Sequence, residues 1–182
     1  GYMLVLDGLK SVSLEIMKEL ANFSGYLWIT HLGSVTPETI QILMDKSNKV
    51  NLYFHSLNDI SLEAIKTLSK WSGSTLILHL TSITTELAKE LAKTDAEYLQ
   101  LYGLTSITPE IAKELSGFKG WEISLNDLTT ITPEVARGLS EFRGTLKLNG
   151  ITSMDLSLAR ELASQDSLYL ENIFSVTPDV AK

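Results

Sequence analysis

The sequence predicts an α/β solenoid of about eight units, with a parallel sheet on the concave face and short helices on the convex face. Two observations predict this fold. A motif that reads LTSITPEIAKEL at residues 104–115 recurs with variation along the whole chain. A short segment in which apolar residues alternate with others precedes each copy, and this alternation is typical of a strand with one buried face. A motif that recurs at an interval of 22 to 25 residues indicates structural units that are stable only when they stack on their neighbours.

The motif describes the start of a short helix. The hydroxyl of Thr108 can accept a hydrogen bond from a free N–H group of the first helical turn. Pro109 suits the first helical position, and Glu110 adds negative charge near the positive end of the helix dipole. The residues expected at this capping position are Ser13, Thr36, Ser61, Thr84, Thr108, Thr132, Asp155 and Thr177.

The copies follow one another at a nearly constant interval. Their first turn residues are Leu9, Leu32, Leu57, Leu80, Leu104, Leu128, Ile151 and Ile173, which lie 22 to 25 residues apart. No linker or change of composition interrupts them, so residues 1–182 form one predicted domain. The chain begins within a predicted strand and stops within a predicted helix. We therefore expect a fragment of a longer protein, whose uncapped ends could associate head to tail.

The predicted strands carry apolar residues at alternate positions. They are residues 4–6, 27–29, 52–54, 75–77, 99–101, 123–125, 146–148 and 168–170. The fourth strand is out of step with its turn, because alternation favours Leu76, Leu78 and Leu80, and we expect a local irregularity such as a bulge there. After four of the helices an aromatic residue stands two places before a glycine, and these rings are expected to pack the helix end against the core. They are Phe23, Trp71, Phe118 and Phe142.

The pattern Leu-x-Leu-x-x-Leu, followed by a helix at this interval, resembles the leucine-rich repeat superfamily. The likeness is closest to LTSITPExAxxL repeats of large bacterial proteins, and it implies a bacterial cell-surface or secreted location. One position departs from the usual repeat, because leucine or isoleucine stands where an asparagine normally bonds the turn backbone. Buried turn groups still need partners. The hydroxyl or carboxylate residues two places further on are therefore predicted to point inward: Ser11, Ser34, Asp59, Ser82, Ser106, Thr130, Ser153 and Ser175.

Composition excludes several classes of protein. The formal net charge of −7 argues against a nucleic-acid-binding protein and against binding to anionic membranes. No apolar segment approaches the ~20 residues that a membrane-spanning helix needs. The chain has no cysteine, so it has neither a disulfide nor a thiolate metal site. No cofactor is predicted.

The candidate binding site is the concave face of the predicted sheet. Its candidate residues are strand residues that point away from the core, namely Tyr26, Trp28, Tyr53, Tyr98, Gln100, Tyr102, Glu122, Lys147 and Tyr169. Tyrosine and tryptophan offer large rigid surfaces with a polar group, as recognition surfaces do. The group of Tyr26, Trp28 and Tyr53 is the richest part. The alternative interpretation is that aromatic residues simply favour strands and pair across them.

The three histidines form a second candidate. His31, His55 and His79 lie 24 residues apart, so adjacent units would bring them together. Three imidazoles at that spacing could hold a zinc ion. However, His55 lies one place earlier in its turn than the other two, and no carboxylate is placed to support a ligand. The alternative is three solvated turn residues, and no metal site is predicted.

The predicted function is that of a non-catalytic binding module that presents its concave sheet to a protein or glycan partner. No cysteine nucleophile and no glycine-rich phosphate loop is present. The carboxylates recur at helix starts, which explains them without catalysis. Five Glu-x-x-Lys/Arg pairs, such as Glu63/Lys66 and Glu134/Arg137, are expected to form a solvated helix surface. The alternative function is a structural spacer or self-assembling segment.

Overall fold

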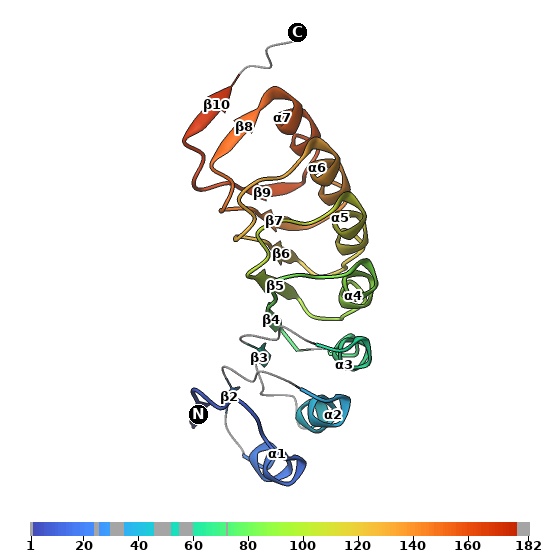
Figure 1. Cartoon of the computed structure of the whole chain (residues 1–182), viewed down its shortest axis with the longest axis vertical. Helices are drawn as coiled ribbons and strands as arrows, with labels where there is room; N and C mark the ends of the chain where they lie inside the picture. Colours follow the sequence, from blue (N-terminus) through green and yellow to red (C-terminus); the bar gives the residue numbers. More distant parts are fainter. Residues whose placement is uncertain are drawn as a thin grey trace.

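A computed structural model describes residues 2–23, 26–29, 35–45, 52–54, 60–71 and 73–177, without the side chains of residues 26–29, 52 and 53. Strands and short helices alternate along the chain (Figure 1). The helices are α1 (Leu14–Ala21), α2 (Pro37–Asp45), α3 (Leu62–Leu68), α4 (Thr85–Leu91), α5 (Pro109–Leu115), α6 (Pro133–Leu139) and α7 (Leu156–Leu162). The strands are β1 (Met3–Leu6), β2 (Tyr26–Ile29), β3 (Leu52–Phe54), β4 (Thr75–His79), β5 (Tyr98–Tyr102), β6 (Glu122–Ser124), β7 (Thr145–Lys147), β8 (Ser153–Asp155), β9 (Ser167–Tyr169) and β10 (Ser175–Thr177).

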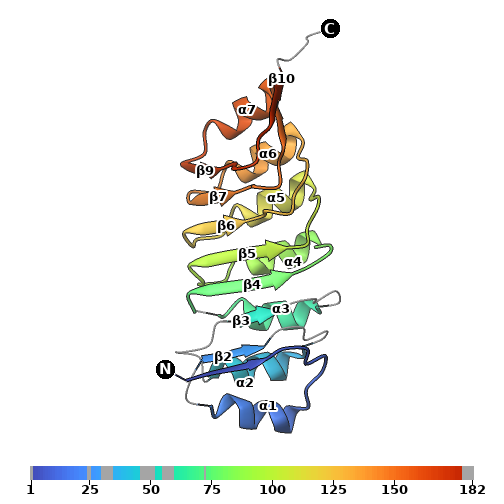
Figure 2. The same ribbon diagram turned by 90° about the vertical axis from the view of Figure 1, so that its left-hand side faces the viewer.

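The main sheet is parallel. Six strands pair in the order β3-β4-β5-β6-β7-β9, and β1 pairs with β2 in the same parallel sense. The helices lie side by side along one side of the strands (Figures 1 and 2). We call a strand together with the next helix a unit, and we call the sheet face away from the helices the open face. The predicted α/β class, with a parallel sheet and short helices, is confirmed.

The strands pair without the expected bulge. Leu76 of β4 stands beside Leu52 and Leu99, and Leu78 beside Phe54 and Leu101, in continuous register. The irregularity lies in the next turn instead. One residue separates Leu78 from Leu80, whereas two residues separate Leu101 from Leu104. The longer turn contains Gly103, whose φ of +82° suits glycine.

The core lies between the sheet and the helices. Alternate strand residues such as Leu76, Leu99 and Leu146 are fully buried, as are the helix residues Leu91 and Leu115. Full burial of a side chain of this size contributes about 1.5–3 kcal/mol. Because each unit buries these residues partly against its neighbours, the core is continuous along the described part of the chain.

Capping fixes where the helices begin. The predicted caps accept a hydrogen bond from the backbone N–H three residues later at α1 to α7, and they are Ser13, Thr36, Ser61, Thr84, Thr108, Thr132 and Asp155. Hydrogen bonds to the cap hydroxyl and the backbone lower the pKa of the next acidic residue, as at Glu110. The sequence predicted these starts because a cap is a local interaction. The eighth predicted cap, Thr177, precedes residues outside the described part.

Aromatic residues close the ends of three helices. Trp71, Phe118 and Phe142 are buried as predicted, whereas Phe23 is only half-buried, and the rings of Phe118 and Phe142 stack with centroids 6.1 Å apart. Each buried ring folds over the glycine two residues later. A β-carbon on Gly120 would overlap the Phe118 ring and lie 2.5 Å from the Ala96 carbonyl oxygen. Glycine is therefore required where the ring and the backbone of the preceding unit both approach.

Polar side chains take the place of this ring in two units. Thr94 donates from Oγ1 to the Trp71 carbonyl oxygen over 2.9 Å. Gln165 donates from Nε2 to the carbonyl oxygens of Phe142 and Gly144 over 3.0 and 2.8 Å. Each of these donor groups thus bonds to the backbone of the preceding unit, whereas Gln165 Oε1 is buried without a hydrogen-bond partner among the described residues.

The prediction of an inward hydroxyl row is wrong. The described members of that row, Ser11, Ser82, Ser106, Thr130, Ser153 and Ser175, are exposed. Residues between the strand and the turn leucine bond the turn backbone instead. Asn126 Oδ1 accepts from Asn149 N over 3.1 Å, and Asn149 Oδ1 accepts from Glu171 N over 3.2 Å. Asp127 accepts in the same way from Gly103 N over 2.6 Å. The turn backbone is thus satisfied by side chains of neighbouring units.

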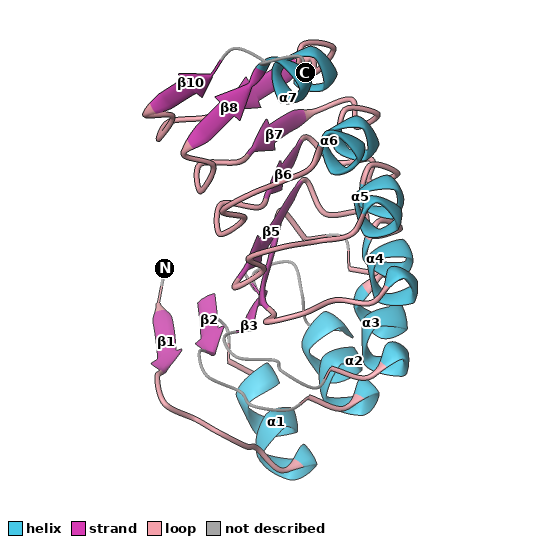
Figure 3. Ribbon diagram, turned by 45° about the horizontal axis from the view of Figure 1, so that its top comes forward, coloured by secondary structure: helices cyan, strands magenta, loops and turns pink. Residues whose placement is uncertain are grey.

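Two further features differ from the sequence analysis. The turn segments β8 and β10 pair in parallel as a separate two-stranded sheet, which Figure 3 shows beside α7. Arg137 binds Glu161 of the next helix through two bonds of 2.8 and 3.1 Å, rather than Glu134 of its own helix. By contrast, Glu63 and Lys66 pair as predicted, at 2.7 Å.

Within the described residues, no helix combines the length and apolar character needed to cross a bilayer.

Replacing Gly120 with alanine should lower the free energy of unfolding by about 1–3 kcal/mol, because the added methyl group has no room beside Phe118 and Ala96. Urea-induced unfolding followed by circular dichroism measures the change. Gly117→Ala is the matched control, since its β-carbon would meet only the Glu114 carbonyl oxygen at 3.3 Å. Equal midpoints for both variants would contradict the proposed contact.

Asn126→Ala should lower the free energy of unfolding by about 1–3 kcal/mol, because it removes the acceptor for the Asn149 N–H. Ser106→Ala should change it by less than about 0.5 kcal/mol, since the hydroxyl is exposed. Thermal and urea unfolding of both variants test this pair. A larger effect at Ser106 than at Asn126 would restore the hydroxyl-row interpretation.

Candidate functional site

The candidate site is the open face from β4 to β9. Side chains on this face stand in rows across the strands, because the pairing is residue for residue. The strand residues on it are Thr75, Ile77, His79, Tyr98, Gln100, Tyr102, Glu122, Ser124, Thr145, Lys147, Ser167 and Tyr169. Ile77 is the single aliphatic member, and Glu122 and Lys147 are the charged ones.

The structure places the described candidates together. Tyr98, Gln100 and Tyr102 of β5 are half-buried, and Tyr169 of β9 is 45% exposed. Tyr102 donates from its hydroxyl to Gln100 Oε1 over 3.2 Å. The side chains of Tyr26, Trp28 and Tyr53 lie outside the described part, so the group predicted to be richest is not described. The described site is therefore centred on β5 to β9.

An ion pair holds the centre of the face. Lys147 Nζ lies 2.8 Å from Glu122 Oε2 and 5.6 Å from the centroid of the Tyr169 ring. The hydrogen bond to Glu122 raises the pKa of Lys147. Glu122 is 8% exposed and Ser124 of the same strand 2% exposed, although both lie on the open face. Neighbouring side chains therefore cover β6.

Trp121 is the site residue that the sequence analysis missed. It is 64% exposed and its ring meets that of Tyr98 edge to face, with centroids 6.1 Å apart. Its backbone is fixed on both sides, since Trp121 N donates to Glu97 O and Thr145 N donates to Trp121 O, each over 2.7 Å. Trp121 precedes β6, so a search for alternation within strands passes over it. The chain length from Phe118 to β6 equals that from Trp71 to β4, so the spacing gives no signal for Trp121.

Acidic residues dominate the edges of the face. Glu97 and Asp166 precede β5 and β9, and Asp127 and Glu171 follow β6 and β9. Glu97 accepts a hydrogen bond from the Ser74 hydroxyl over 2.9 Å. The one lysine on the strand positions from β4 to β9 is already paired with Glu122. This surface therefore disfavours anionic ligands.

The histidine hypothesis is only partly described. His79 lies on β4 beside Tyr102 of β5, whereas His31 and His55 lie outside the described residues. Within the described part, no group of at least three His, Cys, Asp or Glu side chains could hold a metal ion. A zinc site formed by all three histidines therefore stays an untested alternative from the sequence.

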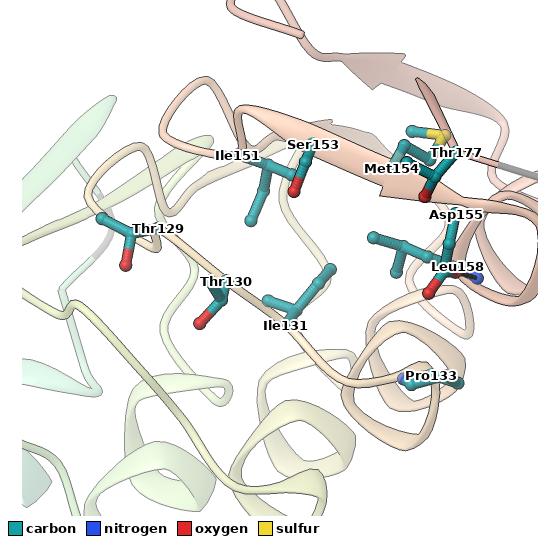
Figure 4. A pocket seen from close by; sticks show the side chains of 10 residues that line it. All are labelled: Thr129, Thr130, Ile131, Pro133, Ile151, Ser153, Met154, Asp155, Leu158 and Thr177. Carbon is teal, nitrogen blue, oxygen red and sulfur yellow. Dashed lines mark hydrogen bonds between the residues drawn. The ribbon is translucent and has the colours of Figure 1, made fainter. Parts of the chain in front are cut away.

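A pocket of about 170 Å³ opens on the turn side, between the segments that follow β6 and β7 (Figure 4). Ile131, Ile151 and Leu158 form its apolar part, and Thr130, Ser153 and Thr177 contribute hydroxyls. Backbone bonds join Thr129 to Thr105 and Phe174 to Thr152, but within the described residues no such bond joins Thr129 to Thr152. The pocket therefore lies where the turn segments separate.

Asp155, the single acidic residue that lines this pocket, caps the start of α7. Asp155 Oδ1 accepts from Leu158 N over 2.8 Å and from the Ser157 hydroxyl over 2.7 Å. These hydrogen bonds lower the pKa of Asp155, with the Leu158 N–H having the larger effect. A carboxylate held in this way is a helix cap and not a poised acid or base.

Lys147→Met should lower the free energy of unfolding by about 1–3 kcal/mol at neutral pH, because Glu122 loses its partner. The folded-state pKa of Lys147 is raised, so the stabilisation is complete below the unfolded lysine value of about 10.4 and is lost as pH rises through the folded value. The difference in free energy of unfolding between wild type and variant should therefore shrink as the pH rises above about 10.4.

Urea unfolding from pH 7 to the alkaline range measures this difference. Lys119→Met, at an exposed lysine outside the strands, is the control. A difference for Lys147→Met that does not depend on pH would show that the pair contributes nothing to stability.

Comparison with known proteins adds no further assignment. No protein-family model, curated protein or solved structure matches the chain. The function must therefore be argued from the chemistry of the open face.

Proposed function

We propose that the chain is a leucine-rich-repeat-type solenoid of about eight units and acts as a non-catalytic binding module. In this proposal the open face is the concave face, and it binds a protein or glycan partner. The observation that carries the proposal is the exposed Trp121, which precedes β6 and contacts Tyr98 of a face that bears mainly polar and aromatic side chains.

Rigidity supports binding through this face. The strands that carry the site rest on fully buried residues such as Leu99, Ile123 and Leu146. Hydrogen bonds and ring contacts hold Gln100, Tyr102 and Lys147 before any ligand arrives. A preorganised surface loses less side-chain entropy on binding than a loose one.

Two features of the described residues support a role without catalysis. The carboxylate of Glu122 is paired with Lys147 and mostly buried, so it is occupied by a structural contact. Helix-start acids such as Glu110 and Glu134 have a lowered pKa from their bonds to backbone and cap groups. Lowered values keep these groups ionised at neutral pH, away from the range that suits a general acid.

The alternative function is a structural segment that self-assembles. Exposed apolar side chains on the outermost described strands favour it, namely Met3 and Val5 on β1 and Val176 on β10. A strand edge of this kind can pair with another chain. Concentration-dependent growth of particle size in light scattering, abolished by Val5→Lys, would favour this alternative over the binding module.

Affinity capture with the purified chain tests the binding function. The site variant replaces Tyr98, Trp121 and Tyr169 with serine, and it should lose partners that the wild type retains from extract and envelope fractions of the source organism. The control variant replaces Ile16, Leu62 and Leu156, exposed apolar residues of the helices, with serine. It should retain them. Equal recovery by all three proteins would contradict a role for the open face.

A further inference from the structure

We infer that the ligand of the open face is a neutral oligosaccharide, bound along the rows from β5 to β9. The inference rests on the proposed function and deepens it. Four observations carry it: the exposed Trp121 ring, the paired polar groups beside it, the near absence of aliphatic side chains, and the sign of the surrounding charge.

Trp121 provides a stacking platform. The face of an indole ring is electron-rich, and it attracts the weakly positive C–H groups on the flat side of a sugar ring. Tyr98 contacts Trp121 edge to face, at an interplanar angle of 79°. This contact supports the indole from one side and leaves 64% of the residue exposed. Tyr169, with 45% exposure, offers a second ring on β9.

The polar groups beside the two rings suit hydroxyl groups. The side chain of Lys147 is 31% exposed and offers donors, while Gln100 of β5 adds an amide. Gln100 Oε1 accepts from Tyr102, while its Nε2 has no partner within the described residues. Sugar hydroxyls both donate and accept, so they can accept from the Lys147 ammonium and from the Gln100 amide without requiring a charge on the ligand.

A protein partner fits the same surface less well. The fully buried core of a protein interface is mainly apolar and depleted in charge. From β4 to β9 the strand positions of the open face offer one aliphatic side chain, Ile77, whereas the ion pair lies near the centre. Tyrosines surrounded by amides, hydroxyls and paired charges match a hydrated, hydroxyl-rich ligand instead.

The surrounding charge excludes acidic glycans. Lys147 is neutralised by Glu122, and the edges carry Glu97, Asp127, Asp166 and Glu171. Uronates, sulfates and phosphates would meet repulsion from these carboxylates. The favoured sugar is therefore uncharged.

The dimensions indicate a chain of sugars. Strands β5, β6, β7 and β9 are neighbours about 4.8 Å apart, so the face from Tyr98 to Tyr169 spans roughly 14 Å. That length accommodates a short oligosaccharide that crosses the strands, with its rings over Trp121 and Tyr169 and its hydroxyls near Lys147 and Gln100.

The test titrates the purified chain with uncharged hexasaccharides (cellohexaose, xylohexaose, maltohexaose and chitohexaose), with polygalacturonate and with a lysine-rich peptide. Calorimetry measures binding, and the part of the tryptophan emission that Trp121→Phe removes reports on Trp121, since the chain also contains Trp28 and Trp71. At least one neutral hexasaccharide should bind and shift the emission to shorter wavelength. Polygalacturonate should not bind. Trp121→Ala should weaken the binding at least tenfold, whereas Trp121→Phe should retain most of it.

Two further variants test whether the binding is specific to the open face and whether its polar side chains contribute. Phe174→Ala removes an exposed aromatic side chain away from the open face and should leave the affinity unchanged. Gln100→Ala should weaken binding severalfold, which tests the polar contacts independently of the aromatic ring. Circular dichroism confirms that each variant is folded.

Several results would overturn the inference. These are no binding of any neutral hexasaccharide, binding that Trp121→Ala leaves unchanged, or binding of the lysine-rich peptide alone. In each case affinity capture still decides the proposed function on its own, because a protein partner lost by the site variant and retained by the helix variant would support the binding module without the glycan.

Discussion

Residue-for-residue pairing of parallel strands is the constraint on which the rest of this structure depends. It places each buried leucine of one strand beside a buried residue of the next, as with Leu99 between Leu76 and Ile123. The same pairing places the open-face residues in rows. The core and the candidate site are therefore two sides of a single register, and a shift of one residue would exchange them.

This constraint also explains why small residues matter where units meet. The rings of Phe118 and Phe142 lie over Gly120 and Gly144, and the backbone of the preceding unit approaches the same glycines. Asn126 and Asn149 then bond the turn backbone of the following unit on the other side of the strands. The units of β6 and β7 are thus attached to their neighbours at both ends of the strand, by packing at one end and by hydrogen bonds at the other.

Local features of the structure could be predicted from the sequence, whereas features that depend on a neighbouring unit could not. Thr108 and Ser61 cap helices because the bond they make lies within one turn. The inward position of Asn126 and the exposed position of Ser106 depend on how two turns lie against each other, which the interval between motifs does not fix. The strands β8 and β10 were missed for the same reason, since each exists only by pairing with the other. In the candidate site, alternation identified Tyr98 and Tyr169, but Trp121 lies outside the strand where alternation has no meaning.

After α4 and α7, Thr94 and Gln165 stand at the position that an aromatic ring occupies after α3, α5 and α6. This difference affects which segments of the chain can be duplicated or removed without loss of the fold. Thr94 needs the carbonyl oxygen of Trp71, and Gln165 needs those of Phe142 and Gly144, all of them in the preceding unit. A segment that carries threonine or glutamine at this position therefore depends on hydrogen bonds to the preceding segment. A segment that carries phenylalanine instead fills this position by packing the ring over its own glycine. Duplication, deletion or shuffling of segments would preserve the fold most easily at junctions that keep such dependent pairs together.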